Sequence, residues 1–450
     1  MVRFVGQALG LSLFFVAASP ALCENDWVLL GGSAEFDQPG VPWNPAPGSE
    51  AYPMARSLSA IWVDGQGDFW MYGGRGRNGT MGDLWRYEPD NEIWTYVDGQ
   101  TTGTSQIVYP AAVGGVGNPG SRYGAGCWVE GGRHLWLFGG YGRARTGAST
   151  WGTGALNDLW KYVIATGTWY WMGGSQYVND PGDYEHASES GWPSGRYFVN
   201  GVSDGRTYYM YGGMDANSRR LQDFWMLDFD TDPPEFTLLG GDATTNTVAT
   251  VPGTIGGTGY PGSRFGQAMW LDESFNVWLY GGYGHYTPTP GFLNDTWKYT
   301  PAGNQWTLQA TNAVGTYPAS HGGFGKPAKR RNAAVWRTND GLFMFGGTGT
   351  HPTTGNTRFN DLWMLNETTG QWQWLDGTDS SSAPIPDYPA YGITGSPLRR
   401  GEMNYWLNED EGKLYFFGGT AGTSADYCHD FWVRDATYEP TAAADWQLWQ

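Results

Sequence analysis

The chain has 450 residues and a formal charge of −18 at pH 7, with 70 Gly, 26 Pro and 26 Trp. The acidic balance argues against a surface for nucleic acid or anionic membrane, because such partners need a basic face, although local basic spots stay open. The Gly, Pro and aromatic content is typical of short strands and tight turns rather than of helices or disorder. We therefore expect an all-β protein.

The first 23 residues have the pattern of a secretory signal peptide. Arg3 precedes the apolar run Ala8–Ala18, and a small-residue segment that ends at Cys23 follows. Cleavage after Cys23 places Ala21 at the −3 position, with Ala18 as an alternative cleavage residue. No later apolar run is long enough for a membrane helix. We expect residues 24–450 to be exported, either secreted or, in a bacterium, periplasmic or at the cell surface.

Two cysteines, Cys127 and Cys428, remain in the chain that follows this segment. An oxidising compartment permits a disulfide between them. They belong to different repeats of the chain, and the sequence does not reveal whether they lie close together. Pairing and two free thiols both stay open.

One pattern of about 70 residues then recurs six times, and such self-similarity determines the architecture. Each copy has a hydrophobic run that ends in a glycine pair, and Asp-x-Trp follows. The glycine pairs are Gly73-Gly74, Gly139-Gly140, Gly212-Gly213, Gly281-Gly282, Gly346-Gly347 and Gly418-Gly419. The Asp-x-Trp residues are Asp83/Trp85, Asp158/Trp160, Asp223/Trp225, Asp295/Trp297, Asp361/Trp363 and Asp430/Trp432. A second aromatic residue follows each of them at Trp94, Trp169, Phe236, Trp306, Trp372 and Trp446.

Every unit therefore predicts the same four strands after a long polar loop. Strand a begins at an Arg, strand b ends in the glycine pair, strand c lies at Asp-x-Trp, and strand d lies at the second aromatic. The segment Leu135–Phe138 is continuously apolar, as strands b are in general, so we expect strands b to be buried on both faces. One four-stranded unit cannot bury its faces alone, so the six must stack, and closure of the stack limits exposed edges.

The glycine pair and Asp-x-Trp with its second Trp resemble the kelch repeat over about residues 27–450. The resemblance implies a six-bladed β-propeller of four-stranded antiparallel blades, similar to the central domain of galactose oxidase but without an evident copper site. It also implies that strand a lines a central channel and that strand d is outermost. One departure is the loop of roughly 20–30 residues between strand d and the next strand a, where many kelch proteins have a short turn.

Closure of the ring has two alternatives. The segment Trp27–Gly32 resembles a strand d with no repeat before it, so we expect it to complete the sixth blade and join the chain ends. In the alternative, Trp446 completes that blade and Trp27 packs outside.

Binding residues are expected on the face that carries the long loops. Strands of a blade alternate in direction, so the b–c and d–a connections emerge together, and binding residues concentrate in loops on rigid scaffolds. Candidate residues on this face are Trp43, His186, His285, Tyr286, His321, His351 and Tyr391.

Strand a begins at an Arg in every unit, and these residues mark the approximate repeat starts. They are Arg56, Arg122, Arg196, Arg264, Arg330 and Arg400. One hypothesis places them around the channel mouth, where guanidinium groups bind carboxylate, sulfate or phosphate and Trp and Tyr rings stack on sugars. The alternative, which we favour, pairs each Arg with the Asp of the Asp-x-Trp motif, because a feature present in every unit usually serves the repeat. We likewise expect the motif tryptophans to pack between blades and the glycine pairs to permit tight backbone geometry.

Enzyme signals are weaker. A copper radical oxidase site needs His and Tyr ligands and a Cys that can crosslink to Tyr, whereas His285, His321 and His351 lie in separate segments and Cys127 lies in an expected inner strand. No cofactor or metal is therefore predicted. A sugar-acid epimerase or lyase is a second enzyme alternative, with the arginine mouth holding a carboxylate.

Three N-glycosylation patterns begin at Asn78, Asn294 and Asn366. Asn78 and Asn366 fall in expected loops or turns, whereas Asn294 abuts Asp-x-Trp and is expected to be too ordered for modification. Taken together, the sequence predicts a secreted kelch-repeat module that binds an extracellular acidic glycan or protein. The alternative is a secreted enzyme that acts on sugars.

Overall fold

The computed structural model describes residues 26–33, 35–40, 48–101, 104–184, 191–231, 234–243, 245–378, 392–422 and 426–436. The expected signal peptide (residues 1–23) and Trp43, His186, Tyr391 and Trp446 lie outside the described residues. The described residues contain strands and two short 3-10 turns, Ile164–Thr166 and Pro301–Gly303, but no α-helix. Within that part of the chain, no helix is long and apolar enough to cross a membrane.

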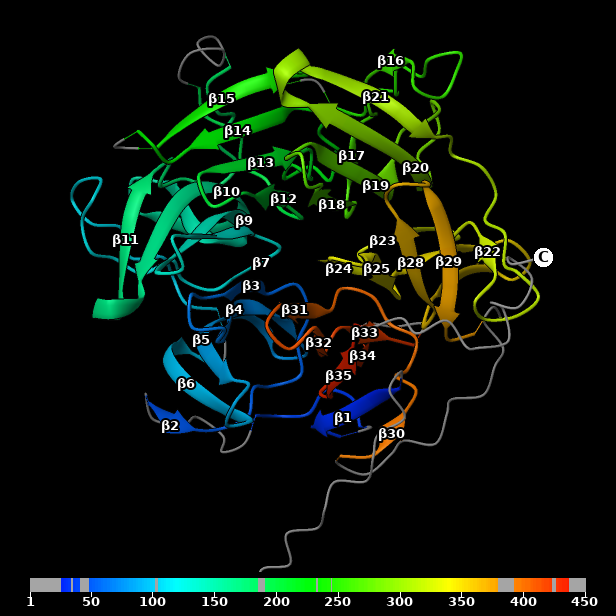
Figure 1. Cartoon of the computed structure of the whole chain (residues 1–450). Coiled ribbons are helices and arrows are strands. Elements are labelled where there is room, and N and C mark those ends of the chain that lie inside the picture. Colours follow the sequence, from blue (N-terminus) through cyan, green and yellow to red (C-terminus); the bar gives the residue numbers. More distant parts are fainter. Residues whose placement is uncertain are drawn as a thin grey trace, which may run out of the picture.

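Among the described residues the strands form six sheets of four to six strands, placed around a common centre (Figure 1). We number the sheets in the order of their inner strands. The first sheet contains β2 (Ser49–Glu50), β3 (Ala60–Val63), β4 (Phe69–Gly76), β5 (Gly79–Glu88) and β6 (Ile93–Gln100). The second contains β7 (Arg122–Tyr123), β8 (Gly126–Glu130), β9 (His134–Gly147), β10 (Thr150–Val163) and β11 (Thr168–Gly173).

The third sheet contains β12 (Asn200–Ser203), β13 (Thr207–Tyr211), β14 (Phe224–Asp228) and β15 (Glu235–Gly240). The fourth contains β16 (Thr258–Gly259), β17 (Arg264–Phe265), β18 (Ala268–Leu271), β19 (Val277–Gly284), β20 (Gly291–Thr300) and β21 (Gln305–Ala310). All neighbouring strands within these two sheets are antiparallel.

The fifth sheet contains β22 (Phe324–Gly325), β24 (Ala334–Thr338), β25 (Gly341–Phe345), β28 (Leu362–Asn366) and β29 (Gln371–Asp376). The sixth contains β1 (Trp27–Gly31), β30 (Thr394–Gly395), β31 (Asn404–Asn408), β32 (Lys413–Phe417) and β35 (Phe431–Asp435). Two small sheets complete the set, β23 (Lys329–Arg331) with β26 (Thr348–His351) and β27 (Gly355–Arg358), and β33 (Thr420–Ala421) with β34 (Asp426–Tyr427). This all-β arrangement fits a β-propeller.

The N-terminal strand joins the last sheet. Strand β1 pairs antiparallel with β35, with Val28 opposite Val433 and Leu29 opposite Trp432. The expectation that the Trp27 strand completes the last unit is therefore confirmed.

Hydrophobic clusters lie between consecutive sheets and account for the core. They connect the first sheet to the second, the second to the third, and so on to the sixth, and a further cluster connects the sixth back to the first. Each cluster contains one motif tryptophan, namely Trp85, Trp160, Trp225, Trp297, Trp363 or Trp432. The expected role of Asp-x-Trp in packing between units is confirmed, as is the burial of strand b at Leu135–Phe138.

The long d–a loops differ from the expectation of four strands per unit. In four sheets the loop that enters the unit adds a short strand outside strand d, namely β2, β16, β22 and β30. In the second and third sheets isolated bridges, Val116 to Tyr170 and Gly191 to Phe236, do the same. These loops thus cover the outer edges, which would otherwise expose unpaired backbone groups.

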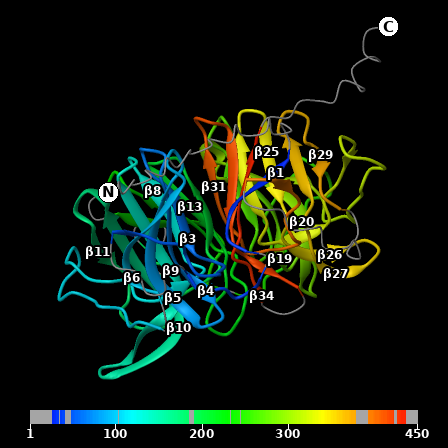
Figure 2. The ribbon, with the colours of Figure 1, turned by 90° about the horizontal axis from the view of Figure 1, so that it is seen from below.

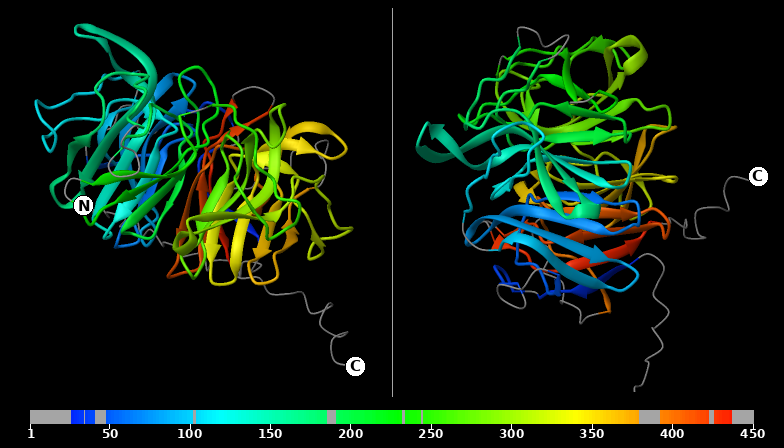
Figure 3. Two further views of the ribbon diagram at one scale, coloured as in Figure 1. Left: turned by 90° about the horizontal axis from the view of Figure 1, so that it is seen from above. Right: turned by 90° about the vertical axis from the view of Figure 1, so that its left-hand side faces the viewer.

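The b–c connections emerge on one side of the molecule. The hairpin of β26 and β27, strand β34 and the end of the β9–β10 hairpin lie on the same side in Figure 2. The β9–β10 hairpin is longer than the others and projects beyond the body of the molecule, as the teal arm in Figure 3 shows.

Candidate functional site

The six repeat arginines are buried, and each forms an ion pair with the motif Asp of its own unit. Arg264 is representative: Nη1 and Nη2 donate to Asp295 Oδ1 and Oδ2, both at 2.8 Å. Its remaining groups donate to backbone carbonyls, Nε to Gly262 at 3.0 Å and Nη1 to Gly281 at 2.9 Å. The six pairs are Arg56–Asp83, Arg122–Asp158, Arg196–Asp223, Arg264–Asp295, Arg330–Asp361 and Arg400–Asp430.

This network has the geometry of the pairing alternative. Burial by itself lowers the pKa of Arg264, but Asp295 outweighs burial and raises that pKa above its usual value. Both side chains have an exposed fraction of 0%. A buried guanidinium group that is doubly bonded to a carboxylate offers no free donor to an acidic ligand. The geometry therefore argues against the ligand-binding hypothesis for all six repeat arginines.

The motif tryptophans are core residues and do not belong to a binding surface. The indole Nε1 of each donates to the Oδ2 atom of the motif Asp in its own unit at 2.7 Å. Their exposed fractions are 0–1%, so neither ring face is open to solvent. The six residues are Trp85, Trp160, Trp225, Trp297, Trp363 and Trp432. The expectation that these six tryptophans pack between units is therefore confirmed, because neighbouring sheets cover both faces of each indole.

A tyrosine from the d–a loop joins this network in three units. The hydroxyl groups of Tyr109, Tyr184 and Tyr317 donate to the motif Asp Oδ2 atoms at 3.0, 2.6 and 2.6 Å. Burial raises the pKa of all three hydroxyls, and the neighbouring carboxylates add to the increase. The loops are thereby fixed to the repeat, in addition to covering the sheet edges.

The glycine pairs link each unit to the next. Both residues of every pair have positive φ, between 64° and 102°. A Cβ atom on the first glycine would approach the carbonyl oxygen of the next repeat Arg, and for Gly418 that oxygen belongs to Arg56 in the first unit, at 2.4 Å. The Gly419 amide donates to the same oxygen at 2.9 Å. The expected need for tight geometry is confirmed, and the last unit contacts the first.

Two positions beside the constant residues lie where strands a and b pair next to the b–c connections. The residue after each repeat Arg pairs in a β ladder or bridge with the residue after each glycine pair. The six pairs are Ser57/Arg75, Tyr123/Tyr141, Tyr197/Met214, Phe265/Tyr283, Arg331/Thr348 and Gly401/Thr420. We call these twelve residues the mouth. Unlike the motif residues, they differ in type from one unit to the next.

Aromatic rings form a continuous belt in the mouth. Tyr123 lies 5.5 Å from Tyr141 and 6.1 Å from Tyr197 between ring centroids. Tyr197 contacts Phe198, which lies 5.0 Å from Phe265. The belt therefore spans the inner edges of the second, third and fourth sheets.

Arginines lie at both ends of this belt. Arg75 lies over the Tyr123 ring at 5.6 Å, and Arg331 lies over Phe265 at 4.9 Å. Arg220 and Arg331 share Tyr283, at 5.2 and 5.9 Å. Cations over aromatic faces are attracted to the ring electrons, which holds these side chains in place.

Arg331 has an unusual electrostatic setting. Burial lowers its pKa, Arg358 and Arg220 add to the decrease, and Glu402 and Tyr283 oppose it. The Nε atoms of Arg220, Arg331 and Arg358 are buried and have no hydrogen-bond partner among the described residues. These three cations thus lie close together with unused donors, on a chain whose overall charge is strongly negative.

The candidate histidines lie in separate local settings. His285 is buried against Ser263 Oγ at 3.2 Å, and burial lowers its pKa, with Arg220 adding to the decrease. His321 contacts Trp374 and bonds the Gly377 carbonyl at 3.0 Å. His351 bonds Thr353 within its own hairpin. Where the chain is described, no group of three or more His, Cys, Asp or Glu side chains is placed to hold a metal ion.

The cysteines and the glycosylation patterns have simple structural outcomes. Cys127 and Cys428 are free thiols. Asn294 is fully buried and donates to the Pro327 carbonyl at 2.9 Å, which leaves no room for a glycan. Asn78 and Asn366 are exposed, at a turn and at the end of β28.

The mouth arginines could have been found by comparing the repeats. Arg330 and Arg331 are adjacent, and alignment on the following Trp correctly selects Arg330 as the repeat residue. The neighbouring position is the one that varies, from Ser57 and Tyr123 to Arg331. The available signal for the mouth was therefore a variable position next to a constant one, on the strand expected to be innermost.

Comparison with known protein families gives a match over part of the chain. Residues 185–386 match the family model of the KLHDC2/KLHL20/DRC7 Kelch-repeats domain. The match supports the kelch family. A kelch domain in turn suggests a protein-interaction module. The search of curated proteins gave no significant match.

Proposed function

We propose that the chain is a six-bladed kelch propeller that binds an acidic segment of a partner protein through the mouth. The observation that carries the proposal is the aromatic belt with Arg75 at one end and Arg220 and Arg331 at the other. Guanidinium groups favour carboxylates, and tyrosine rings supply contact area at low conformational cost. A positive opening attracts acidic segments, whereas the acidic remainder of the chain repels acidic surfaces that do not reach the opening.

The six-bladed ring is supported by contacts that run from unit to unit. Hydrophobic clusters connect each sheet to its neighbour and the sixth sheet to the first. The hydrogen bond from Gly419 to Arg56 joins the same two units at the inner edge.

An acidic glycan is the second candidate ligand, favoured by the tyrosines that lie beside the cations. Tyr123 and Tyr141 are partly exposed next to Arg75, and aromatic faces of this kind can stack on sugar rings. Both candidate ligands present carboxylates. They differ in whether a protein or a glycan carries these groups.

Export is part of the same proposal. It rests on the signal-peptide pattern of residues 1–23 and would place the partner outside the cell. N-terminal sequencing of the mature protein tests it, with a start directly after Cys23 expected and an intact Met1 contradicting it.

A binding titration tests the mouth. We expect residues 24–450 to bind poly-glutamate or oligogalacturonate, with affinity falling as salt rises because partly exposed charges are screened. The double variant Arg220→Gln with Arg331→Gln should weaken binding at least about tenfold, since each lost charged contact contributes on the order of 1 kcal/mol or more. The ligand should be recovered unchanged, whereas product that accumulates with time would favour the enzyme alternative.

The matched control removes two arginines from the opposite side. Arg133 and Arg206 are exposed at turns between strands a and b, and Gln at both makes the same change in net charge. If both double variants weakened ligand binding equally, the effect would come from the net charge of the chain and not from the mouth, which would contradict the proposal. Tighter binding of poly-glutamate would favour a protein partner, and tighter binding of oligogalacturonate would favour a glycan.

A further inference from the structure

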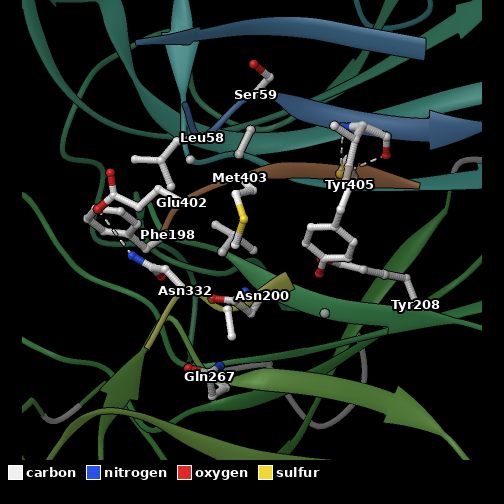
Figure 4. Close-up of a pocket in the computed structure, with 17 residues that line it drawn as sticks. Leu58, Ser59, Phe198, Asn200, Tyr208, Gln267, Asn332, Glu402, Met403 and Tyr405 are labelled. Carbon is white, nitrogen blue, oxygen red and sulfur yellow. Dashed lines mark hydrogen bonds between the residues drawn. The ribbon is translucent and has the colours of Figure 1, made fainter. Parts of the chain in front are cut away.

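A cavity of about 140 Å³ lies where residues of the six sheets meet, and its lining begins one residue after the mouth positions that follow the repeat Arg (Figure 4). Residues of all six units line it, and Glu402 is the one charged side chain among the described residues that do so. Aromatic and apolar walls come from Phe198, Tyr208, Tyr405 and Met403, which Figure 4 shows around the same space. The volume exceeds that of a single water molecule several times over.

Six residues with a left-handed backbone separate the mouth from this cavity. They lie two positions after each repeat Arg, and their φ values fall between 53° and 66°. They are Leu58, Gly124, Phe198, Gly266, Asn332 and Glu402. Backbone hydrogen bonds connect neighbours, for example Gly124 to Leu58 at 2.9 Å and Glu402 to Asn332 at 3.0 Å.

Side chains at four of these positions are strained without a structural need. Glycine adopts positive φ freely and fills the position in two units, which shows that the ring forms without a side chain there. The other four units carry Leu58, Phe198, Asn332 and Glu402, and all four residues line the cavity. Strain of this kind is a common property of functional sites.

Two acceptors in the cavity have unused capacity. Gln267 is 2% exposed, and its Nε2 donates to the Tyr211 carbonyl at 2.7 Å. Its Oε1 is buried and has no hydrogen-bond partner among the described residues. The Glu402 carboxylate accepts long bonds from Ser57, Asn332 and Thr420, at 3.5, 3.3 and 3.4 Å. Buried acceptors with weak or missing partners are unfavourable, so a donor in the cavity would stabilise the folded chain.

We propose that this inner cavity binds a small organic ammonium ion, with Glu402 as its counter-ion and Gln267 as a second acceptor. An ammonium group brings three donors and no acceptor, which matches the unused groups. The rings of Phe198, Tyr208 and Tyr405 are suited to a neighbouring cation. The same carboxylate excludes anions of similar size. The Glu402 carboxylate adjoins the mouth, since it accepts from Ser57 and Thr420 and raises the pKa of Arg331. The ligand is a small cation and not an acidic partner, so the proposal goes beyond the function proposed above.

Calorimetric titration with three molecules of matched size tests the inference. We expect n-butylammonium to bind residues 24–450 with one-to-one stoichiometry, and 1-butanol and butyrate to bind at least about tenfold more weakly because a paired charge is lost. Glu402→Gln should weaken butylammonium binding to the level of butanol. The control Glu409→Gln makes the same chemical change at an exposed position on the a–b turn of the same unit and should leave binding unchanged.

A second variant separates binding from structure. Glu402→Gly relieves the left-handed strain, so it should raise the Tm while it abolishes butylammonium binding. Binding of butanol as tight as that of butylammonium would overturn the inference. So would unchanged binding by Glu402→Gln, or a folded protein that binds no butylammonium.

Discussion

Two neighbouring arginines, Arg330 and Arg331, play different structural parts. Arg330 is buried and bonded to Asp361 at 2.6 and 2.7 Å, within a network that every unit repeats. Arg331 turns to the mouth, lies over Phe265, and keeps an unpaired Nε among the described residues. The difference shows that a residue constant across repeats serves the repeat, whereas its variable neighbour is available for recognition.

The largest effect is expected when the constant network loses its carboxylate. Asp295→Ala leaves the buried Arg264 and the Trp297 Nε1 without their acceptor. We expect a loss of about 3–5 kcal/mol in the free energy of unfolding, because an uncompensated buried charge is unfavourable. Chemical denaturation measures it, with the exposed Asp340→Ala as control and a change near zero expected there. Equal losses for the two variants would contradict the structural role of the network.

The contact between the last unit and the first gives the next largest effect. Gly418 and Gly412 have similar φ, 67° and 62°, but only at Gly418 would a Cβ meet the Arg56 carbonyl, at 2.4 Å. Gly412→Ala should destabilise by about 1 kcal/mol, from the left-handed conformation alone. Gly418→Ala should add about 2 kcal/mol of steric strain to that penalty. Thermal unfolding compares the two, and indistinguishable Tm values would argue against this contact.

Acid should weaken the same junction through a buried histidine. Burial lowers the pKa of His429 to about 4, and its Nε2 bonds the Pro53 carbonyl at 2.9 Å. The unfolded histidine has a pKa of about 6.5, so this contribution to stability is complete above that pH and is lost as the pH drops from about 6.5 towards the folded pKa. We expect a loss of about 2 kcal/mol by about pH 5 from this group. His429→Gln should lack that part of the loss, and identical pH profiles would contradict it.

A smaller effect of opposite sign is expected at the cavity. Glu402→Gly should raise the free energy of unfolding by about 1 kcal/mol, because glycine adopts φ of 64° without strain. Glu402→Ala removes the same carboxylate but keeps the unfavourable conformation, so it should not stabilise. Chemical denaturation of the pair distinguishes strain from charge, and equal changes would show that the backbone is not the cause.

The repeat was predictable because constant residues interact with constant residues. Arg, Asp and the glycine pair recur at related positions, so their pairing within a unit followed from their spacing. The role of Trp27 in completing the last sheet followed in the same way, from its similarity to strand d.

The mouth arginines were not singled out, although their variable position beside the constant Arg was a signal. The cavity could not be predicted because its residues do not repeat. Tyr123, Arg331 and Glu402 belong to different units and come near the centre of the molecule only because the units are arranged around it. The left-handed residues beside the mouth could not be predicted either. Leu58 and Phe198 have positive φ, which is unfavourable for these residue types, so their side chains give no sign of this backbone conformation. The long d–a loops also pair with the outer strands, a role that the sequence did not indicate.

Chemical denaturation of Arg330→Ala and Arg331→Ala compares the constant arginine with its variable neighbour. We expect a loss of about 3–5 kcal/mol in the free energy of unfolding for Arg330→Ala, which leaves Asp361 as a buried unpaired charge. We expect a change within about 1 kcal/mol for Arg331→Ala, whose main contacts are ring faces at the mouth. Similar losses for both variants, or a larger loss for Arg331→Ala, would contradict the division between constant and variable arginines.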